Sequence, residues 1–589
     1  MPFDPTAPFY FFEDASAAGP GLLFAGAERW IEAQALGDVR PALSAVRAAL
    51  ADGKWVAGTL AYEAAGALEP RMARDANLPQ PLVRFGVFAA PDRRDWSEVG
   101  GSARHRRTTI RDLTPGMDQA AYEAMVETAL AYIRAGDIYQ ANMTLQVAGR
   151  FAGHPLALWD RLRRSQRMGE GALVREPDGR WLLSASPELF FACGGRRVIA
   201  RPMKGTARRR PDAASDRQAA KALAADEKNR AENLMITDLI RNDLSRTAVP
   251  GSVTVPDPFV VETYPTLHTM VSGVEAALRE NLGPVDILET MFPCGSITGA
   301  PKVRAGQIIN ELERAGRGIY TGSIGWIAPG GDARFNVAIR TAVIEGQRLS
   351  LGVGAGIVSD SVPADEWREC QTKAAFLTAR ARPFHLIETM RFVPSEGVAN
   401  LDLHMQRLEK SAGYFGRPFD EQRAVRDLES VTSLLSAPSR IRMLLDQDGR
   451  VAVSASPIPP SKPVLDITVA PLPVPPDDWR LFHKSSDRAF YDQARQDSDA
   501  DEVVFERPDG LLTEGSFTNL FVRRGSRLLT PHAASGLLPG ILRARLIADR
   551  KAVEADLTVD DLRGGEVFVG NALRGLVPAH HVARRQGAS

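Results

Sequence analysis

The sequence predicts an α+β protein with more than one domain. A chain of 589 residues is too long for one hydrophobic core, so two to four domains are expected. Strand-like and helix-like segments are mixed. Residues 189–200 have the pattern of a β-hairpin that turns at Gly194-Gly195. Residues 227–246 have the apolar spacing of a helix, with Leu234, Met235, Leu239 and Ile240 expected to face inward, and residues 363–380 indicate another helix with Pro363 in its first turn. Hydrophobic content of 44% and charged content of 24% are typical of a globular chain.

A domain boundary is expected near residues 380–385. The Ala-rich segment 372–382 indicates the end of a helix, which Pro383 stops, and a new apolar segment starts at Phe384. We therefore expect a first module over residues 1–382, with an N-terminal part at 1–115 and a catalytic part at 116–382. A second module is expected over residues 383–589.

Composition argues against several classes of protein. Lys+Arg and Asp+Glu both total 72, so the chain lacks the excess of positive charge that is typical of a nucleic-acid binder. No window of about 18 uninterrupted apolar residues predicts a membrane span, and the N-terminus lacks the pattern of a signal peptide. The three cysteines, at positions 193, 294 and 370, fit neither a disulfide framework nor a zinc site. A soluble, cytoplasmic protein with no nucleic-acid or membrane partner is expected.

The predicted hairpin brings two reactive side chains to one end of the sheet. With Gly194-Gly195 at the turn, Glu188 would lie opposite Arg201, close to Lys204. Strict alternation would place Glu188 and Lys204 on opposite faces. Both can reach one substrate only if Pro202 ends the ladder or forces a bulge.

Three carboxylates suggest a metal site without establishing it. Glu232 lies at the edge of an apolar stripe, where a bare carboxylate is costly unless it is paired. Glu366 and Glu369 share a helix face, and Lys373 follows one turn later. Magnesium prefers such oxygen ligands together with those of the substrate. An exposed Glu369–Lys373 pair is the alternative.

Several motifs, in order along the first module, are similar to those of the chorismate-utilising enzymes. Arg201-Pro-Met-Lys204-Gly-Thr206 resembles the Pro-hydrophobic-Lys-Gly-Thr signature of aminodeoxychorismate synthases, whereas anthranilate synthases carry Ala in place of the Lys. The other motifs are Ser186-Pro-Glu-Leu-Phe, Asn229-Arg-Ala-Glu-Asn-Leu-Met, Gly295-Ser-Ile-Thr-Gly-Ala-Pro-Lys302, Tyr320-Thr-Gly-Ser-Ile-Gly, Arg334-Phe-Asn-Val-Ala-Ile-Arg340 and Gly352-Val-Gly-Ala-Gly-Ile-Val-Ser-Asp360.

This resemblance implies a fold of two packed antiparallel sheets edged by helices, and a reaction. Lys204 would be a nucleophile toward chorismate, activated by a lowered pKa to which some of the flanking Arg201, Arg208, Arg209 and Arg210 would contribute. Glu188 would be the general acid/base for the departing hydroxyl, with His268 near the ring. Magnesium would be held by Glu232 and Glu369, with Glu366 close by. The substrate-binding residues implied are Thr298, Gly299, Tyr320, Arg340, Gly354, Gly356 and Lys373.

The second module resembles the fold-type IV pyridoxal phosphate (PLP) enzymes, which are built from two α/β subdomains. Phe482-His-Lys484-Ser-Ser-Asp-Arg-Ala-Phe-Tyr491 is similar to their cofactor-lysine segment, and Glu514 would pair with the pyridine nitrogen. The implied phosphate contacts are Arg407, Ile541, Leu542, Asn571 and Ala572. Leu542 departs from the family, in which many members have Thr.

The two resemblances together imply a bifunctional enzyme. The first module would aminate chorismate to 4-amino-4-deoxychorismate, and the second would release pyruvate to give 4-aminobenzoate. None of the three cysteines has the context of a glutaminase nucleophile, so ammonia is expected from a separate glutamine amidotransferase subunit or from solution. A homodimer through the second module is expected by analogy. The alternatives are an anthranilate or isochorismate synthase fused to an aminotransferase, and a regulatory protein with inactive sites.

Overall fold

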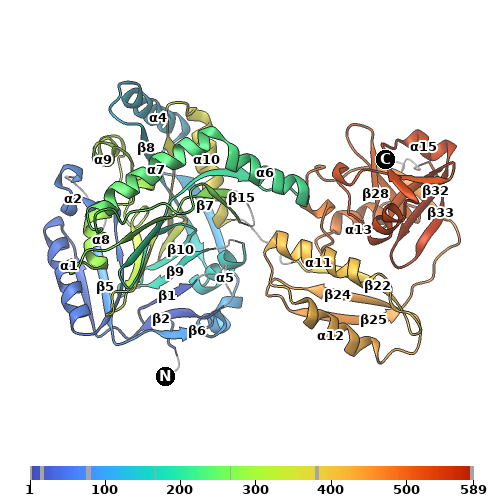
Figure 1. The fold of residues 1–589 in the computed structure, drawn as a ribbon, viewed down its shortest axis with the longest axis horizontal. Helices are drawn as coiled ribbons and strands as arrows, with labels where there is room; N and C mark the ends of the chain where they lie inside the picture. The colour runs from blue at the N-terminus through green and yellow to red at the C-terminus, as the bar shows by residue number, and fades with distance from the viewer. Residues whose placement is uncertain are drawn as a thin grey trace. The chain divides into compact units, whose positions relative to one another are not determined.

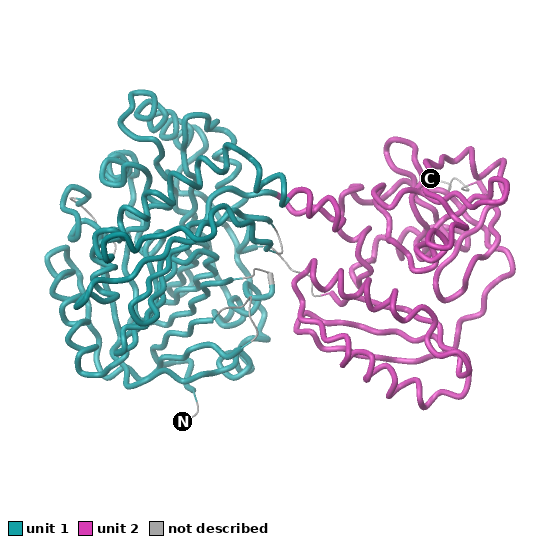
Figure 2. Tube along the Cα trace, in the orientation of Figure 1, with its two compact units in different colours: residues 1–207, 220–381 teal, residues 208–219, 382–589 magenta. Residues whose placement is uncertain are grey.

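The computed structural model describes residues 3–13, 19–74, 81–165, 168–264, 267–378 and 384–583. The chain forms two compact units, coloured separately in Figure 2. Unit 1 contains residues 1–207 and 220–381, and unit 2 contains residues 208–219 and 382–589. The short segment 208–219 therefore folds with unit 2, although it lies well inside the first half of the sequence.

Unit 1 contains two large antiparallel sheets. The first has the order β17-β8-β21-β20-β10-β9-β1-β2-β6, with β7 also paired to β8, and the second has the order β16-β12-β11-β19-β18-β4-β5-β3. The strands of the first sheet are β1 (Phe9–Glu13), β2 (Gly21–Ala25), β6 (Asp92–Arg94), β7 (Thr109–Pro115), β8 (Gln140–Ala152), β9 (Glu170–Arg175), β10 (Trp181–Ser186), β17 (Gly299–Ala300), β20 (Thr341–Glu345) and β21 (Arg348–Ile357). Those of the second are β3 (Arg29–Ala33), β4 (Trp55–Leu60), β5 (Val83–Phe88), β11 (Leu189–Gly194), β12 (Arg197–Arg201), β16 (Val274–Ala277), β18 (Ser323–Ile327) and β19 (Ala333–Val337).

The two sheets pack on each other through apolar side chains. Tyr10 and Phe24 of the first sheet share a buried cluster with Ala57 and Phe88 of the second. Helices cover the sheets, and α1 packs on β3, β4 and β5 (Figure 1). The helices of this half of the chain are α1 (Leu36–Ala51), α2 (Ala65–Leu68), α3 (Trp96–Gly100), α4 (Gln119–Arg134), α5 (Pro155–Ser165), α6 (Ala213–Ala225), α7 (Glu227–Ser245), α8 (Pro284–Met291), α9 (Lys302–Leu312) and α10 (Pro363–Ala374).

A small third sheet positions the predicted nucleophile. Its order is β13-β15-β14, formed by β13 (Met203–Arg208), β15 (Leu267–Val271) and β14 (Val260–Thr263). Helix α7 packs against β15. Lys204 lies on β13 and His268 on the neighbouring strand β15, so the third sheet brings these two candidate residues to adjacent strands.

The hairpin is present, but its turn lies one residue later than predicted. Gly194 pairs with Arg197, so Gly195 and the next residue form the turn, and Gly195 has a φ of 58°, which glycine adopts without strain. A bulge then shifts the register, and Leu189 pairs with Arg201. Strand β12 ends at Arg201 and a new strand begins after Pro202, which confirms the expected end of the ladder.

The helix predicted over residues 227–246 is α7, but its buried face differs from the prediction. Leu234, expected inside, is 55% exposed, whereas Asn233 is fully buried. The Asn233 amide donates to the carbonyl oxygens of Lys204 (3.3 Å) and Met270 (3.2 Å). A buried amide with these bonds is stable, so Asn233 lies on the buried face of α7 together with Ile236, Ile240 and Leu244.

The helix predicted over residues 363–380 is shorter in the structure. Helix α10 begins with Pro363 in its first turn, as expected, and ends at Ala374, followed by a 3-10 turn at Ala375–Leu377. The predicted stop at Pro383 lies outside the described residues. No helix in the described ranges is both long and apolar enough to cross a membrane.

Unit 2 has two sheets. An antiparallel sheet of order β23-β22-β24-β25 packs with α11 and α12 around one apolar cluster. A mixed sheet of order β28-β27-β26-β33-β32-β29-β30-β31 forms the second part, in which β26 runs parallel to β27 and β33. The elements are β22 (Leu386–Val393), β23 (Gly397–Val398), α11 (Leu401–Phe415), α12 (Glu421–Thr432), β24 (Ser439–Leu445), β25 (Val451–Pro457), β26 (Leu465–Pro471), α13 (Ala489–Gln496), β27 (Glu502–Glu506), β28 (Leu512–Gly515), β29 (Asn519–Arg524), β30 (Arg527–Thr530), α14 (Ile541–Ala548), β31 (Ala552–Glu554), α15 (Val559–Gly564), β32 (Glu566–Asn571) and β33 (Gly575–His581).

Candidate active sites

Lys204 contacts side chains and backbone from two other parts of unit 1. Its Nζ lies 3.6 Å from Oε2 of Glu232 on α7. A Cβ built on Gly356 of β21 would lie 2.8 Å from the same Nζ, so the amine occupies the space that the missing side chain leaves. Lys204 is therefore held between α7 and β21, with about 20% of its side chain exposed.

Glu188 is a buried acid beside Lys204. Burial raises the pKa of Glu188 to about 7, although the Ser296 hydroxyl, the Met203 N–H and the Lys204 ammonium oppose this shift. The Ser296 hydroxyl donates to Glu188 Oε1 at 2.6 Å. A carboxyl with a pKa near neutrality can both give and take a proton at physiological pH, as a general acid/base must.

Two of the arginines expected to act on Lys204 pair with acidic side chains instead. Arg201 pairs with Glu262, and Arg209 pairs with Asp216 within unit 2. The charged neighbours of Lys204 are instead carboxylates, those of Glu188, Glu232 and Glu366. Arg201 and Arg209 thus have acidic partners of their own, and a contribution of the four flanking arginines to the reactivity of Lys204 stays a prediction.

Lys373 connects the candidate metal helix to the glycine-rich strand. Its Nζ donates to the carbonyl of Gly354 (2.7 Å) and pairs with Glu369 Oε1 (2.7 Å). Gly354 and Gly356 lie inside β21, opposite Thr144 and its neighbours on β8, rather than in a loop. The pairing of β21 with β20 ends at Leu351. The part of β21 that contains Gly354 and Gly356 is therefore not hydrogen-bonded to β20. A Cβ on Gly354 would lie 2.6 Å from the Met143 carbonyl, so close backbone packing requires glycine there.

The three candidate metal ligands lie on α7 and α10. Burial raises the pKa of Glu366, the Ser361 hydroxyl opposes this, and the nearby Glu369 carboxylate adds to the rise. Such repulsion between two carboxylates is what a divalent cation relieves. Glu232 and Glu369 each pair with a lysine, however, and no group of three His, Cys, Asp or Glu side chains in the described ranges is arranged to hold a metal.

The remaining candidate substrate residues are buried around this region. The Thr298 hydroxyl donates to the Cys294 carbonyl at 2.8 Å, and the neighbouring Gly299 has a φ of 146° in β17. Tyr320 packs so closely on β21 that a Cβ on Gly352 would lie 2.1 Å from its ring. The others are Arg340, whose pKa is lowered by burial, and His268, whose Nδ1 lies 3.0 Å from the Thr263 hydroxyl.

Gln140 is a site residue that the sequence did not single out. Both polar atoms of its buried amide lack a hydrogen-bond partner in the described structure. The amide lies 3.4 Å from a Cβ built on Gly356, the same position that contacts Lys204. An unsatisfied buried amide indicates a missing polar ligand. A glutamine in a strand gives no separate signal in the sequence.

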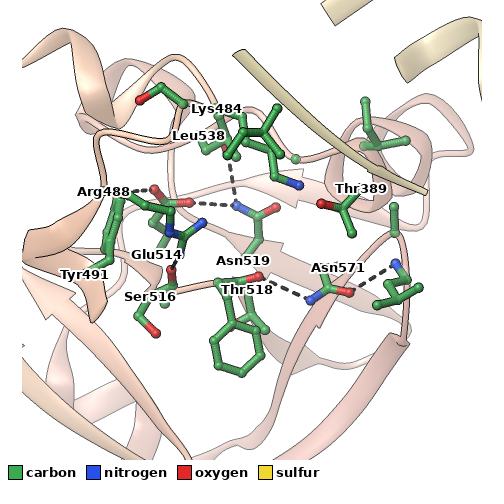
Figure 3. A pocket seen from close by; sticks show the side chains of 18 of the residues that line it. Thr389, Lys484, Arg488, Tyr491, Glu514, Ser516, Thr518, Asn519, Leu538 and Asn571 are labelled. Atoms are coloured by element: carbon green, nitrogen blue, oxygen red, sulfur yellow. Dashed lines mark hydrogen bonds between the residues drawn. The ribbon is translucent and has the colours of Figure 1, made fainter. Parts of the chain in front are cut away.

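Lys484 projects into a cavity of about 490 Å³ in unit 2, shown in Figure 3. Burial lowers the pKa of Lys484 to about 7, and the Arg407, Arg488 and Arg442 guanidinium groups lower it further, against the opposing effect of Glu388. The amine is therefore partly neutral at physiological pH, which formation of a bond to an aldehyde requires. Thr389 faces the same cavity (Figure 3).

Glu514 is the buried acid of the same cavity. The Tyr491 hydroxyl donates to Glu514 Oε1 at 2.6 Å, and the Asn519 amide approaches Oε2 at 3.4 Å. Burial raises the pKa of Glu514 to about 8. A protonated ring nitrogen beside Glu514 would supply the cation that its carboxylate lacks, so the site fits the pyridine ring of PLP.

Arg407 is positioned by residues that the sequence analysis did not identify. Its guanidinium forms two bonds to Glu388, with Nε at 2.9 Å from Oε1 and Nη2 at 2.6 Å from Oε2. His404 Nδ1 lies 2.6 Å from the same carboxylate. Although burial opposes it, these partners hold the pKa of Glu388 at about 2. Arg407 thus enters the cavity as a fixed cation, which suits a phosphate.

The other predicted phosphate contacts also line the cavity or adjoin it. Ile541 begins α14, and a Cβ on the preceding Gly540 would lie 1.9 Å from the Asn519 Oδ1. Leu542 packs against β32, where its Cδ2 would lie 2.8 Å from a Cβ built on Gly570. The leucine at this position, where many family members have Thr, therefore makes an apolar contact. Asn571 Oδ1 accepts from backbone N–H groups two and three residues later, beside Ala572.

Two family models match the chain, one after the other along the sequence. Residues 8–379 match the family model described as chorismate binding enzyme, so the chain belongs to the chorismate binding enzymes. Residues 385–582 match the model described as amino-transferase class IV. A class IV domain implies PLP as its cofactor, and the chorismate-binding and class IV domains expected from the sequence are confirmed.

Two curated relatives each match less than half of the chain. Aminodeoxychorismate synthase component 1 of Salmonella typhimurium is 42% identical over 253 residues, which are 43% of this chain and 56% of that protein. Anthranilate synthase component 1 of Thermus thermophilus is 41% identical over 285 residues, which are 47% of this chain and 58% of that protein. The chain thus spans less than two thirds of these relatives, and overall identity does not separate the two activities.

Solved structures show the fold of the first unit. Anthranilate synthase component I from Streptococcus pneumoniae superposes with a TM-score of 0.52 at 24% identity, covering 64% of this chain and 91% of that chain. The menaquinone-specific isochorismate synthase from Escherichia coli gives a TM-score of 0.52 at 20% identity, covering 64% of this chain and 89% of that chain. At these identities the comparison establishes the fold alone.

Proposed function

We propose that this protein makes 4-aminobenzoate from chorismate in two steps, one in each unit. The first step replaces the C4 hydroxyl of chorismate by ammonia, with release of water. The second releases pyruvate from 4-amino-4-deoxychorismate and leaves the aromatic ring. The observation that carries the proposal is the Lys204 amine, which stands against Gly356 among three carboxylates of a chorismate-family fold.

Lys204 favours amination at C4 over the anthranilate reaction. Both kinds of synthase are about equally similar to the chain, so only a specific side chain can discriminate. In the resembling families an anthranilate synthase has Ala at this position, which offers no nucleophile. Here Lys204 would add to the substrate ring, and Glu188, with its pKa of about 7, would protonate the departing hydroxyl.

Glu232, Glu366 and Glu369 are the residues that would hold magnesium. The repulsion between Glu366 and Glu369 supports this assignment, as does the position of Lys204 near both Glu232 and Glu366. Magnesium would neutralise the ring carboxylate and act as a Lewis acid. Arg340 and Lys373 would take the second carboxylate of chorismate, for which a guanidinium and an ammonium are suitable partners.

Ammonia would come from a separate glutamine amidotransferase. The three cysteines of the chain are all buried, and burial raises the pKa of Cys193 and Cys294 to about 12 and that of Cys370 to about 11. A glutaminase nucleophile has to be a reactive thiolate. These pKa values therefore support a partner subunit, or free ammonia, as the nitrogen source.

In unit 2, Lys484 would move the proton from the ring C4 of the substrate, and Glu514 would keep the pyridine nitrogen protonated. PLP supplies an electron sink at this position. Arg407 and the backbone at Ile541 and Ala572 would hold its phosphate. A homodimer through unit 2 is part of this proposal, by analogy with the resembling enzymes.

The test is to supply the purified protein with chorismate, magnesium, PLP and ammonium salt and to follow 4-aminobenzoate by fluorescence. We expect wild type to make 4-aminobenzoate and Lys484→Ala to accumulate 4-amino-4-deoxychorismate. Anthranilate as the product would overturn the role given to Lys204. Accumulation of 4-amino-4-deoxychorismate in wild type would instead indicate that unit 2 is an aminotransferase.

A further inference from the structure

The PLP cavity of unit 2 has more positive charge than its cofactor requires. Its lining includes Asp492 and Glu514 as its acids, but seven arginines: Arg407, Arg440, Arg442, Arg480, Arg488, Arg495 and Arg574. Arg407, assigned to the phosphate, is paired with Glu388. A cavity with this excess of guanidinium groups is built for an anion in addition to the cofactor phosphate.

Three of these arginines have no acidic partner among the described residues. Arg480 pairs with Asp478, and both Arg488 and Arg495 lie within 3.8 Å of Asp492. Arg440 donates only to the Ser456 hydroxyl, at 3.1 Å, and no ion pair is formed by Arg442 or Arg574 in the described structure. Arg440 and Arg574 are half-buried, and a half-buried guanidinium without a counter-ion is costly unless a ligand supplies one, whereas Arg442 is exposed.

Arg574 is held on an aromatic surface. Its guanidinium carbon lies 5.2 Å from the centroid of the Phe517 ring, and its buried Nε has no hydrogen-bond partner within the described structure. The side chain of Asn571 joins the two residues, because its Oδ1 accepts from Arg574 N (3.0 Å) and its Nδ2 donates to the Phe517 carbonyl (3.2 Å).

Phe517 belongs to a rigid loop. The buried carboxylate of Glu502 accepts from the N–H of Ser516 (2.9 Å), the N–H of Phe517 (3.2 Å) and the hydroxyl of Thr518 (2.7 Å). The loop is thus fixed before any ligand arrives, and the Phe517 face and Arg574 form a preorganised surface for a flat anion.

Arg442 occupies a different part of the cavity. It lies on β24 of the antiparallel sheet, whereas Arg574 follows β32 of the mixed sheet. Arg442 is close enough to the reactive amine to lower the pKa of Lys484. The two unpaired guanidinium groups therefore come from separate sheets and line the same cavity as Lys484.

We propose that this cavity selects an amine with two carboxylates, one bound by Arg574 against Phe517 and the other by Arg442 with Arg440. The inference rests on the proposed function and deepens it, because 4-amino-4-deoxychorismate is a ring amine with one carboxylate on the ring and one on the enolpyruvyl side chain. An aminotransferase for amino acids with one carboxylate would have no use for the second guanidinium site.

Three stable ring amines test this assignment on the full-length protein loaded with PLP. One is 4-amino-3-(carboxymethoxy)benzoate, which carries both carboxylates. The others carry one each: 4-amino-3-methoxybenzoate keeps the ring carboxylate, and (2-aminophenoxy)acetate keeps the side-chain carboxylate. Binding is measured by the change in visible absorbance of the cofactor, which reports on unit 2 alone even if a probe also binds unit 1.

We expect wild type to bind the dicarboxylate at least about tenfold more tightly than either monocarboxylate. Arg442→Met and Arg574→Met should each weaken the binding of the dicarboxylate by about tenfold to a hundredfold. Each variant should also weaken the binding of a different monocarboxylate. Arg495→Met is the matched control: this arginine also lies 5.3 Å from the Phe517 centroid but is paired with Asp492, so its loss should leave the preference for two carboxylates intact.

The outcomes separate this inference from the proposed function. Equal affinity of wild type for all three probes, with 4-aminobenzoate still formed from 4-amino-4-deoxychorismate, would overturn the inference and leave the function standing. Failure to consume 4-amino-4-deoxychorismate would overturn the function itself. If a Met variant loses PLP, the Arg→Lys variant keeps the charge without the guanidinium fork, and we expect an intermediate affinity; wild-type affinity there would contradict guanidinium recognition.

Discussion

The Nζ of Lys204 lies where the side chain of residue 356 would be if that residue were not glycine. A Cβ on Gly356 would stand 2.8 Å from this nitrogen, which is closer than such atoms approach in proteins. Gly356 has ordinary strand geometry, so its role is to make room rather than to adopt an unusual backbone conformation. This contact links β21 to the reactivity of the first site.

Gly356→Ala should therefore displace the Lys204 amine without disturbing the surrounding fold. We expect the rate of chorismate amination to fall by about tenfold or more, because misplacement of about 1 Å is costly to catalysis, while the melting temperature stays close to wild type. Steady-state kinetics and calorimetry measure the two effects. Gly354→Ala is the contrasting variant, since its Cβ meets the Met143 carbonyl at 2.6 Å and should lower stability instead.

Glu188 should make amination depend on pH around neutrality. Its pKa of about 7 means that the protonated form, which would serve the departing hydroxyl, is lost as the pH rises through 7. At a constant concentration of free ammonia, the rate of amination should then fall from pH 6 to pH 8. Glu188→Gln should be slower by about a hundredfold and should lack this dependence. A pH profile unchanged in the variant would remove Glu188 from the role of acid.

Glu514 should reduce the stability of PLP-free unit 2 as the pH rises. Its pKa of about 8 in the folded protein exceeds the ordinary 4.5, so the folded state holds a proton that the unfolded state releases. Stability from this group is present below about pH 4.5 and is lost as the pH rises to about 8. Calorimetry of PLP-free protein should show Glu514→Gln gaining stability relative to wild type between pH 6 and pH 8.5, and no relative gain would contradict the assignment.

The buried pair Arg317–Glu313 should stabilise β8, the strand that pairs with β21 of the first site. Arg317 Nη2 bonds Glu313 Oε1 at 2.7 Å and the Asn142 carbonyl at 2.6 Å, and Glu313 accepts from the hydroxyl of Thr144 at 2.9 Å. Removal of one partner leaves a buried charge, so Arg317→Met should lower the free energy of unfolding by about 3–5 kcal/mol. Urea unfolding measures this, and the double variant Arg317→Met/Glu313→Leu, which removes both charges, should recover part of the loss.

The sequence by itself determined the two modules and most of the chemical groups in both sites. The motifs around Lys204 and Lys484 carry reactive side chains in local patterns that need no tertiary information. The expected end of the hairpin at Pro202 follows in the same way, since proline lacks the N–H that a ladder requires.

Only the tertiary structure decided which groups meet. The turn lies one residue later, at Gly195, and on α7 the Asn233 amide is buried and hydrogen-bonded while Leu234 is exposed. The tertiary structure also places the Gln140 amide near Gly356 and brings the unpaired Arg442 and Arg574 into one cavity. These contacts join residues far apart in the chain. Their energies depend on burial and on which partner is nearest, and a local pattern of side chains contains neither quantity.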